Sequence, residues 1–349
     1  MRATVASIAA EQDADGALPW FRGGQLDPWD SVEAAMALDV GGAHDRAVAA
    51  YRWLAARQRP DGSWAAEYRA GAESAPAAES NHAGYLAVGA WHSWLITDDE
   101  QLVTELWPVI RRGLDLVTRM QLPGGAMGWA LRPDGTADDT ALLTGNASIF
   151  QALRCGTALA GLQGEAQPDW ELAVADLGAA LRTQPDAFAD RSRYSMDWYY
   201  PVLGGAVTGT AARERLAADW DRFVVPGLGA RCVSDRPWVT GAETCELALA
   251  LAAAEQRDAV IEQVAAMQHL RHDDGSYWTG LVYADDVRWP VERTTWTAAA
   301  VVLAADALSG ATPASGLFTD PSALPPAGMP ENRPESAGWL TGGAGTVLP

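Results

Sequence analysis

A short motif recurs four times along the chain, and this recurrence constrains the fold more than any other feature of the sequence. The motif places a glutamine before a turn glycine and a tryptophan, and its copies occupy residues 12–20, 58–64, 121–129 and 268–278. Each copy follows an amphipathic segment, such as 45–57, and the glycine supplies the turn that ends that segment. Supersecondary units that recur in this way indicate a repeat architecture, in which neighbouring units bury one continuous core.

The segments between the motifs complete a pattern of helical hairpins. The amphipathic segments, which we expect to form outer helices, are 5–12, 45–57, 100–120, 170–181, 211–223 and 258–267. They alternate with inner segments that are apolar on more than one face and start near Trp29, Asn81, Asn146, Asp197, Glu243 and Glu292. This alternation predicts an all-α (α/α)6 toroid, a single domain over residues 1–309 that closes when the N-terminal helix packs beside the last hairpin. Residues 310–349 are rich in Pro, Gly, Ser and Thr, so we expect an extended or partly disordered tail.

The composition restricts the partners and the location of the protein. Its formal net charge is -20 and all 25 basic residues are arginine, which disfavours nucleic acid as a partner. No run of about eighteen apolar residues predicts a membrane span, and residues 1–12 lack the features of a signal peptide, so we expect a cytoplasmic protein. The 3 cysteines lie in or beside apolar segments, and no histidine cluster suits a metal, so we expect neither a metal nor a cofactor. The sequence does not predict the oligomeric state.

Residues 53–64 (WLAARQRPDGSW) resemble the glutamine-tryptophan motif of squalene-hopene cyclases and of the related prenyltransferase β-subunits. Both families are toroids, so the resemblance implies the same fold here. It also implies an Asp-x-Asp-Asp acid motif in a cyclase, or zinc bound by Asp, Cys and a late His in a prenyltransferase. This chain has only the pairs 138–139, 273–274 and 285–286, and residues 289–296 contain neither Cys nor His. The repeats and the apolar inner segments keep a terpenoid cyclase or prenyltransferase-like enzyme, with an isoprenoid substrate, as an alternative.

A second resemblance, to the glucoamylase-like and other six-hairpin glycoside hydrolases, covers more of the chain in order. Residues 27–33 (DPWDSVE) look like the first inner-helix entry of those enzymes, where Trp and Asp bind sugar. Residues 94–115 are similar to one of their outer-helix patterns, and residues 196–201 (MDWYYP) look like a later inner-helix entry. The glucoamylase general acid is a glutamate that directly follows a tryptophan, whereas Trp129 is followed here by Ala130. The resemblance implies an atypical hydrolase, a lyase or an epimerase.

Polar residues at the starts of the inner segments are the candidate site, because these starts open on one central pocket in a toroid. Burial and like-charge neighbours can raise the pKa of one acid while another acid stays ionised, which provides an acid and a base. The catalytic candidates are Glu79, His82, Asp197, Glu243, Glu246 and Glu292. The candidates for substrate binding are Asp27, Trp29, Asp30, Glu33, Asn81, Asn146, Trp198, Tyr199, Tyr200, Arg293 and Trp296. Helix capping is the simpler explanation of any one of these acids, so their convergence carries the prediction.

The mixture of carboxylates, amides and aromatic rings suits a polyhydroxylated ligand better than a hydrocarbon. We therefore expect an enzyme that acts on a small sugar-like molecule or glycoside by carboxylate acid/base chemistry. A non-catalytic toroid that binds a glycan or a lipid is a further alternative. Two or more inward carboxylates within reach of each other would favour sugar chemistry, and an aromatic cavity with one isolated acid would favour cyclisation. A pocket without a perturbed acid would favour binding alone.

Overall fold

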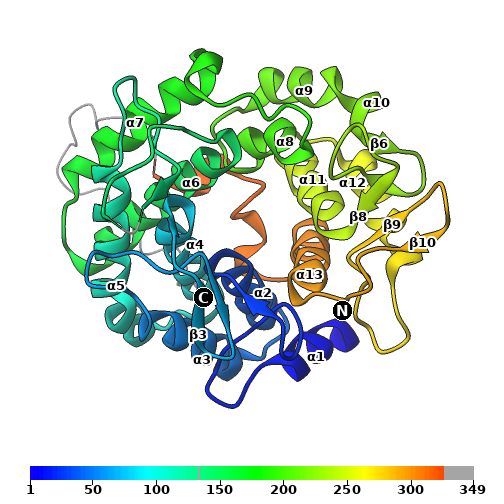
Figure 1. The fold of residues 1–349 in the computed structure, drawn as a ribbon, viewed down its shortest axis with the longest axis horizontal. Coiled ribbons are helices and arrows are strands. Elements are labelled where there is room, and N and C mark those ends of the chain that lie inside the picture. The colour runs from blue at the N-terminus through cyan, green and yellow to red at the C-terminus, as the bar shows by residue number, and fades with distance from the viewer. Residues whose placement is uncertain (133, 326–349) are drawn as a thin grey trace, which may run out of the picture.

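Six inner helices form a closed ring in the computed structural model, which describes residues 1–132 and 134–325. Within these residues the inner helices are α2 (Pro28–Val40), α4 (Ser80–Thr97), α6 (Leu143–Gln163), α8 (Ser195–Leu203), α11 (Gly241–Ala253) and α13 (Thr295–Ser309). Each packs against the next, and α13 packs against α2, so the row of helices closes on itself (Figure 1). The predicted (α/α)6 toroid is therefore confirmed.

The outer helices cover the ring and explain the difference in composition between the two kinds of segment. They are α1 (Arg2–Glu11), α3 (His44–Ala55), α5 (Glu100–Arg119), α7 (Pro168–Thr183), α9 (Gly209–Ala218) with α10 (Trp220–Phe223), and α12 (Arg257–Ala266), which a 3-10 turn, Met267–Leu270, extends. The inner helix α4 is buried from Ser80 to Ser93, because neighbours surround it. The outer helix α5 buries one stripe and exposes the opposite face, which is the amphipathic pattern seen in the sequence.

The repeated glutamines join each hairpin to the next outer helix. The Gln58 side-chain amide donates to the carbonyl of its turn glycine, Gly62, at 3.1 Å and to the carbonyl of Val109, on α5, at 2.8 Å. The same two kinds of bond recur for Gln12 with Gly16 and Arg46, and for Gln121 with Gly125 and Ala173. Each turn glycine has a positive φ, which an L side chain rarely adopts. A Cβ on Gly62 would also overlap the carbonyl oxygen of Arg112, so the turn must be glycine.

The fourth copy of the motif is shifted by three residues relative to the prediction that placed its glutamine at Gln268. Arg271, four residues before Gly275, occupies the glutamine position, since Arg271 bridges to Tyr277 as Gln121 bridges to Met127. Gly275 also packs against α1, where a Cβ would lie 2.6 Å from the carbonyl carbon of Ala3. The last repeat therefore packs on the first helix and seals the ring.

Short antiparallel strands gather at the end of the ring where the inner helices begin, which we call the mouth. One sheet has the order β1 (Gln25–Leu26), β2 (Glu67–Arg69), β3 (Ala72–Ala75), and another has the order β10 (Val287–Arg288), β9 (Gly280–Val282), β8 (Trp238–Thr240). The remaining pairs are β4 (Ala78–Glu79) with β5 (Ala130–Leu131), and β6 (Val224–Val225) with β7 (Gly229–Ala230). Strands β4 and β8 lead directly into α4 and α11, so they fix where those helices start.

The chain after α13 packs against the helices at the end of the ring away from the mouth. It forms two 3-10 turns, Pro313–Gly316 and Pro321–Ala323, and it buries Leu317, Phe318 and Leu324. Arg154, on α6, donates to the carbonyls of Leu324 and Pro325 at 3.0 and 2.8 Å. The rest of the predicted tail, 326–349, lies outside the described residues. Among the described helices, none is both long and apolar enough to cross a membrane.

Candidate active site

A row of three acids, Asp27, Asp30 and Glu33, begins α2 at intervals of three residues, which places their side chains on one helix face. Asp27 is the N-cap residue of α2, and its Oδ1 accepts a hydrogen bond of 2.9 Å from the backbone N–H of Asp30. Its Oδ2 accepts from the indole N–H of Trp20 at 2.9 Å. These donors hold Asp27 at the mouth beside Asp30.

Glu33 lies one turn deeper and is buried. Its Oε1 accepts hydrogen bonds from the indole N–H of Trp29 at 2.8 Å and from the phenol of Tyr85, on α4, at 2.9 Å. Burial raises the pKa of Glu33 to about 7, while these two donors act in the opposite direction by stabilising the carboxylate. Glu33 therefore exchanges its proton near neutral pH.

Glu246 reaches the same region from α11. The phenol of Tyr199, on α8, donates to Oε2 of Glu246, while Oε1 is buried without a hydrogen-bond partner among the described residues. Burial raises the pKa of Glu246 well above its usual range, and the nearby charge of Glu33 raises it further. Glu243 is also buried one turn earlier on the same helix.

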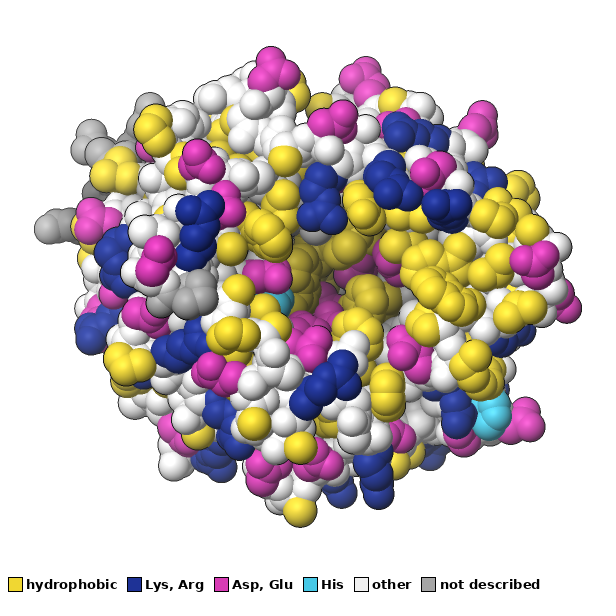
Figure 2. Space-filling view, viewed as in Figure 1, with side chains coloured by type: hydrophobic (Ala, Val, Ile, Leu, Met, Phe, Trp, Pro, Cys, Tyr) yellow, Lys and Arg dark blue, Asp and Glu magenta, His cyan; other side chains and the backbone are white. Residues whose placement is uncertain are grey.

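Asp30 completes the cluster and is only half-buried. Desolvation raises the pKa of Asp30 well above its usual range, and the charges of Asp27, Glu33 and Glu246 add to that shift. The carboxyls of α2 and α11 thus influence one another, although α13 lies between the two helices in the ring. We call Asp27, Asp30, Glu33 and Glu246 the acidic cluster. Figure 2 shows a central hollow whose wall carries acidic and hydrophobic side chains and a histidine.

His82 and Glu79 extend the cluster from the start of α4. The Nε2 atom of His82 lies 4.0 Å from Oδ1 of Asp27 and 3.8 Å from Oε2 of Glu79. The ring of His82 is buried, and its Nδ1 has no hydrogen-bond partner among the described residues. Asn81 is buried beside it at the same helix start.

Aromatic rings surround the acids. The ring of Trp29 lies 5.1 Å from that of Tyr85 and 5.4 Å from that of Tyr200, measured between centroids, and Tyr200 lies 5.8 Å from Tyr199. Trp296, at the start of α13, stacks on Trp20 at 6.4 Å. Burial raises the pKa of all three tyrosines well above its usual range, so their phenols remain hydrogen-bond donors.

Five of the predicted residues lie away from the acidic cluster, and three of these are Asp197, Trp198 and Asn146. Oδ1 of Asp197 accepts from the backbone N–H and the hydroxyl of Thr144, and Asp197 and Trp198 line a separate cavity of about 390 Å³. The indole N–H of Trp198 donates to the carbonyl of Arg215 at 2.9 Å. The side-chain amide of Asn146 bonds to both backbone groups of Met127, so it holds the repeat turn in place.

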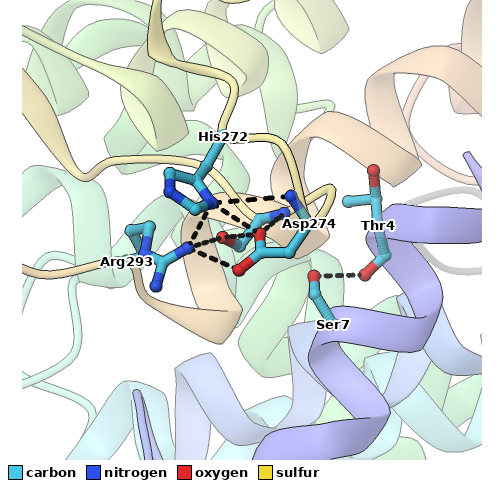
Figure 3. A network of polar contacts seen from close by, with 6 residues as sticks. Thr4, Ser7, His272, Asp274 and Arg293 are labelled. Carbon is cyan, nitrogen blue, oxygen red and sulfur yellow. Dashed lines mark hydrogen bonds and ion pairs between the residues drawn. The ribbon is translucent and has the colours of Figure 1, made fainter.

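Glu292 and Arg293 line another cavity, of about 570 Å³, between α1 and the start of α13. Figure 3 shows Arg293 in a polar network with His272 and Asp274, beside Ser7 of α1. The Nη1 atom of Arg293 donates to Asp274 at 2.6 Å and lies 2.7 Å from Nδ1 of His272. Hydrogen bonds from the hydroxyl and backbone N–H of Ser276, and then one from Arg293, hold the pKa of Asp274 well below its usual range. Burial raises the pKa of Glu292, which lies apart from the cluster.

Sequence reasoning missed Tyr85 and Trp20 as hydrogen-bond donors, and it assigned Asp30 and Glu33 to binding alone. The spacing of three residues from Asp27 to Glu33 was the signal that could have identified them as one titrating row. No comparable signal marks Tyr85, because it lies five residues after the start of α4, inside an apolar segment of the sequence.

Comparisons with known proteins identify relatives of this chain in sequence and in fold. No protein-family model matches the chain. A curated relative, the MMP endo-(1,4)-3-O-methyl-alpha-D-mannosidase of Mycolicibacterium hassiacum, is 56% identical over 317 residues, which are 91% of this chain and 88% of the relative. A solved glycosidase in complex with glucose superposes with a TM-score of 0.68 at 17% identity, over 91% of this chain and 96% of that one. A D-mannose isomerase superposes with a TM-score of 0.65 at 11% identity, over 86% and 95% of the two chains.

A ring of six hairpins with carboxyls and aromatic rings at its mouth defines a glycosidase-like, carbohydrate-active enzyme, and this protein is one. The solved structures share the fold alone, because their sequence identity is low. The identity with the curated relative extends over nearly the whole chain. The chain belongs to the family of the MMP endo-(1,4)-3-O-methyl-alpha-D-mannosidase.

Proposed function

We propose that this enzyme hydrolyses α-glycosidic bonds within a chain of O-methylated mannose, with Asp30 as the proton donor and Glu246 as the base. The acidic cluster carries this proposal, because it brings carboxyls of raised pKa from two inner helices together beside a central hollow whose wall is acidic and hydrophobic. The printed activity of the curated relative supports the choice of substrate.

Asp30 is suited to donate a proton to the leaving sugar. Desolvation and the charges of its acidic neighbours raise the pKa of Asp30 and so favour its protonated form, which is the form of a proton donor. It is also half-buried, and therefore a glycosidic oxygen in the hollow can reach it. As the bond between the anomeric carbon and that oxygen breaks, the proton of Asp30 passes to the oxygen.

Glu246 is suited to activate water. Burial and the charge of Glu33 raise the pKa of Glu246, which makes its carboxylate a stronger base once it is ionised, and the Tyr199 phenol opposes this shift by stabilising the carboxylate. The other carboxylate oxygen is buried without a hydrogen-bond partner among the described residues. A water molecule admitted to that oxygen in the complex with substrate would lose a proton to Glu246 while its own oxygen bonds to the anomeric carbon. Direct attack by water inverts the configuration of that carbon, so the released sugar should begin as the β-anomer.

A sugar fits this site better than an isoprenoid. A carbocation pocket needs an aromatic wall with few charges, whereas four carboxyls of two inner helices meet here. The ring of Trp29, which is partly exposed, can stack on the apolar face of a pyranose while the acids bind its hydroxyl groups.

The test is hydrolysis of an O-methylated α-1,4-manno-oligosaccharide by the wild type and by variants of single acids. Asp30→Asn and Glu246→Gln should each lower kcat by roughly 10²- to 10⁴-fold, the usual contribution of a general acid or base. Glu292→Gln is the matched control, because burial also raises the pKa of that acid but it lies outside the cluster. It should retain most of the activity. A wild type that releases no sugar, or variants with undiminished kcat, would disprove the proposal.

A further inference from the structure

The sheet of β8, β9 and β10 has two unlike faces. Val239 on β8 pairs with Leu281 on β9, and both are buried. In the adjacent register position Trp238 pairs with Val282, and Val282 pairs with Val287 on β10. Residues that pair across antiparallel strands share one face. The second face is therefore a row of apolar side chains that points away from the core.

Trp289 extends this row. Its ring meets that of Trp238 edge-on at 4.9 Å between centroids, and the indole N–H of Trp238 donates to the carbonyl of Trp289 at 2.8 Å. The exposed fraction is 53% for Trp289 and 49% for Val287. Solvent-facing sides of antiparallel sheets usually carry polar residues, so a fixed and exposed apolar row indicates a binding surface. We call Trp238, Val282, Val287 and Trp289 the open apolar row.

The open apolar row lies beside the mouth of the ring. Strand β8 leads directly into α11, which carries Glu246, and the chain passes from β10 to the start of α13. Figure 2 shows hydrophobic side chains gathered over the position of β8, at the rim of the central hollow. A chain molecule bound in the hollow can thus continue onto this surface.

We propose that the open apolar row binds the part of the O-methylated sugar chain that extends beyond the cleaved bond. This inference rests on the proposed function. An indole ring stacks on the apolar face of a pyranose and, together with the valines, can contact its methyl ethers, which lack the hydroxyl donor and add apolar surface. Each methyl group buried there should strengthen binding by about fourfold.

Charge favours a sugar chain over a second copy of this protein as the occupant. The exposed residues Asp285 and Asp286 follow β9 and flank the row, and each copy carries a formal net charge of -20. Two such faces would repel each other, whereas a neutral methylated sugar meets no such repulsion.

The test measures binding in the Glu246→Gln variant, which separates affinity from turnover. Calorimetry measures the affinity of this variant, and of the same variant carrying Trp289→Ala, for an O-methylated manno-oligosaccharide. The same two proteins are then measured with the unmethylated oligosaccharide of equal length. This substitution should weaken binding of the methylated chain by about tenfold and reduce its advantage over the unmethylated chain. A methyl mannoside that fills only the hollow should bind equally well. Ile261→Ala, which removes an exposed side chain on α12, is the control and should change nothing.

Unchanged affinity of Trp289→Ala for the methylated chain would overturn the inference, and so would an equal loss for both chains. A shift from dimer to monomer in sedimentation, with sugar affinity unchanged, would also overturn it and identify the row as a contact between copies. Hydrolysis by the wild type is assayed separately. An enzyme that cleaves the chain but binds it normally with Trp289→Ala disproves this inference alone, whereas one that binds the chain without cleaving it disproves the proposed function alone.

Discussion

The phenol of Tyr85, on α4, donates a hydrogen bond of 2.9 Å to Glu33, on α2, and so links two neighbouring inner helices through the acidic cluster. The bond stabilises the ionised form of Glu33 and opposes the effect of burial on its pKa. The strength of this link therefore depends on the protonation state of Glu33.

Tyr85→Phe should lower the free energy of unfolding more at pH 8 than at pH 5. At pH 8 Glu33 is ionised, and loss of a donor to a buried charged group costs about 1.5–3 kcal/mol. At pH 5 Glu33 is protonated and the loss is smaller. Denaturant unfolding at both pH values measures the difference. Tyr51→Phe is the matched control, because Tyr51 is fully buried and its hydroxyl has no partner in the described structure. A loss that is equal at the two pH values would refute the link to Glu33.

Glu33→Gln should make stability less dependent on pH. The pKa of Glu33 rises from 4.5 to about 7 on folding, so the folded state binds this proton more tightly. Its contribution to stability is fully present below pH 4.5, is lost as the pH rises to about 7, and amounts to about 3 kcal/mol. The neutral amide that replaces the Glu33 carboxyl does not ionise, so the variant does not lose this stability as the pH rises. The free energy of unfolding at a series of pH values should therefore fall less steeply in the variant, whereas exposed Glu214→Gln should keep the wild-type slope.

Gln58→Ala should weaken the contact between the second hairpin and α5. The substitution removes the bonds to Gly62 and Val109 and the acceptor that Arg112 uses at 2.9 Å. We expect a loss of about 2 kcal/mol in the free energy of unfolding, because each such bond contributes roughly 1 kcal/mol. Chemical denaturation provides the measurement. Gln101→Ala removes an exposed glutamine of α5 and should be nearly neutral. A similar loss for both variants would show that the amide does not join the hairpins.

Arg154→Leu should loosen residues 313–325 without opening the mouth. The guanidinium of Arg154 holds the carbonyls of Leu324 and Pro325, and the substitution removes both bonds. Limited proteolysis should then cut this segment faster than in the wild type, whereas hydrolysis of a short mannoside should persist. An unchanged cleavage rate in that segment would contradict the anchoring role of Arg154.

The toroid could be predicted from the sequence because its repeats are physical requirements. A turn glycine that packs against the next outer helix tolerates no side chain, as Gly62 and Gly275 show, so the pattern persists in every copy. The register of the fourth copy was misplaced because Arg271 replaces the glutamine. The sequence contains a nearby glutamine, Gln268, that imitates the missing one.

The candidate site could be predicted only as a set of helix starts. Asp27 and Asp197 look alike in sequence, since each lies at the start of an inner helix within two residues of a tryptophan. Asp27 caps its helix at the mouth, whereas Asp197 lies inside the first turn and binds Thr144 of the neighbouring helix. The rotation of each helix about its own axis decides between these outcomes. That rotation follows from packing against helices that are distant in sequence, which residue types at a helix start do not encode.

The contact between α1 and α13, which closes the ring, joins two segments that are synthesised far apart in time. The ribosome releases α1 well before two of its packing partners, the turn at Gly275 and helix α13. The ring can therefore close only after α13 has emerged, and until then the surfaces that α1 and α13 bury against each other lack their partners. Nascent chains that stop before α13 should thus expose apolar surface to chaperones, however complete their earlier hairpins are.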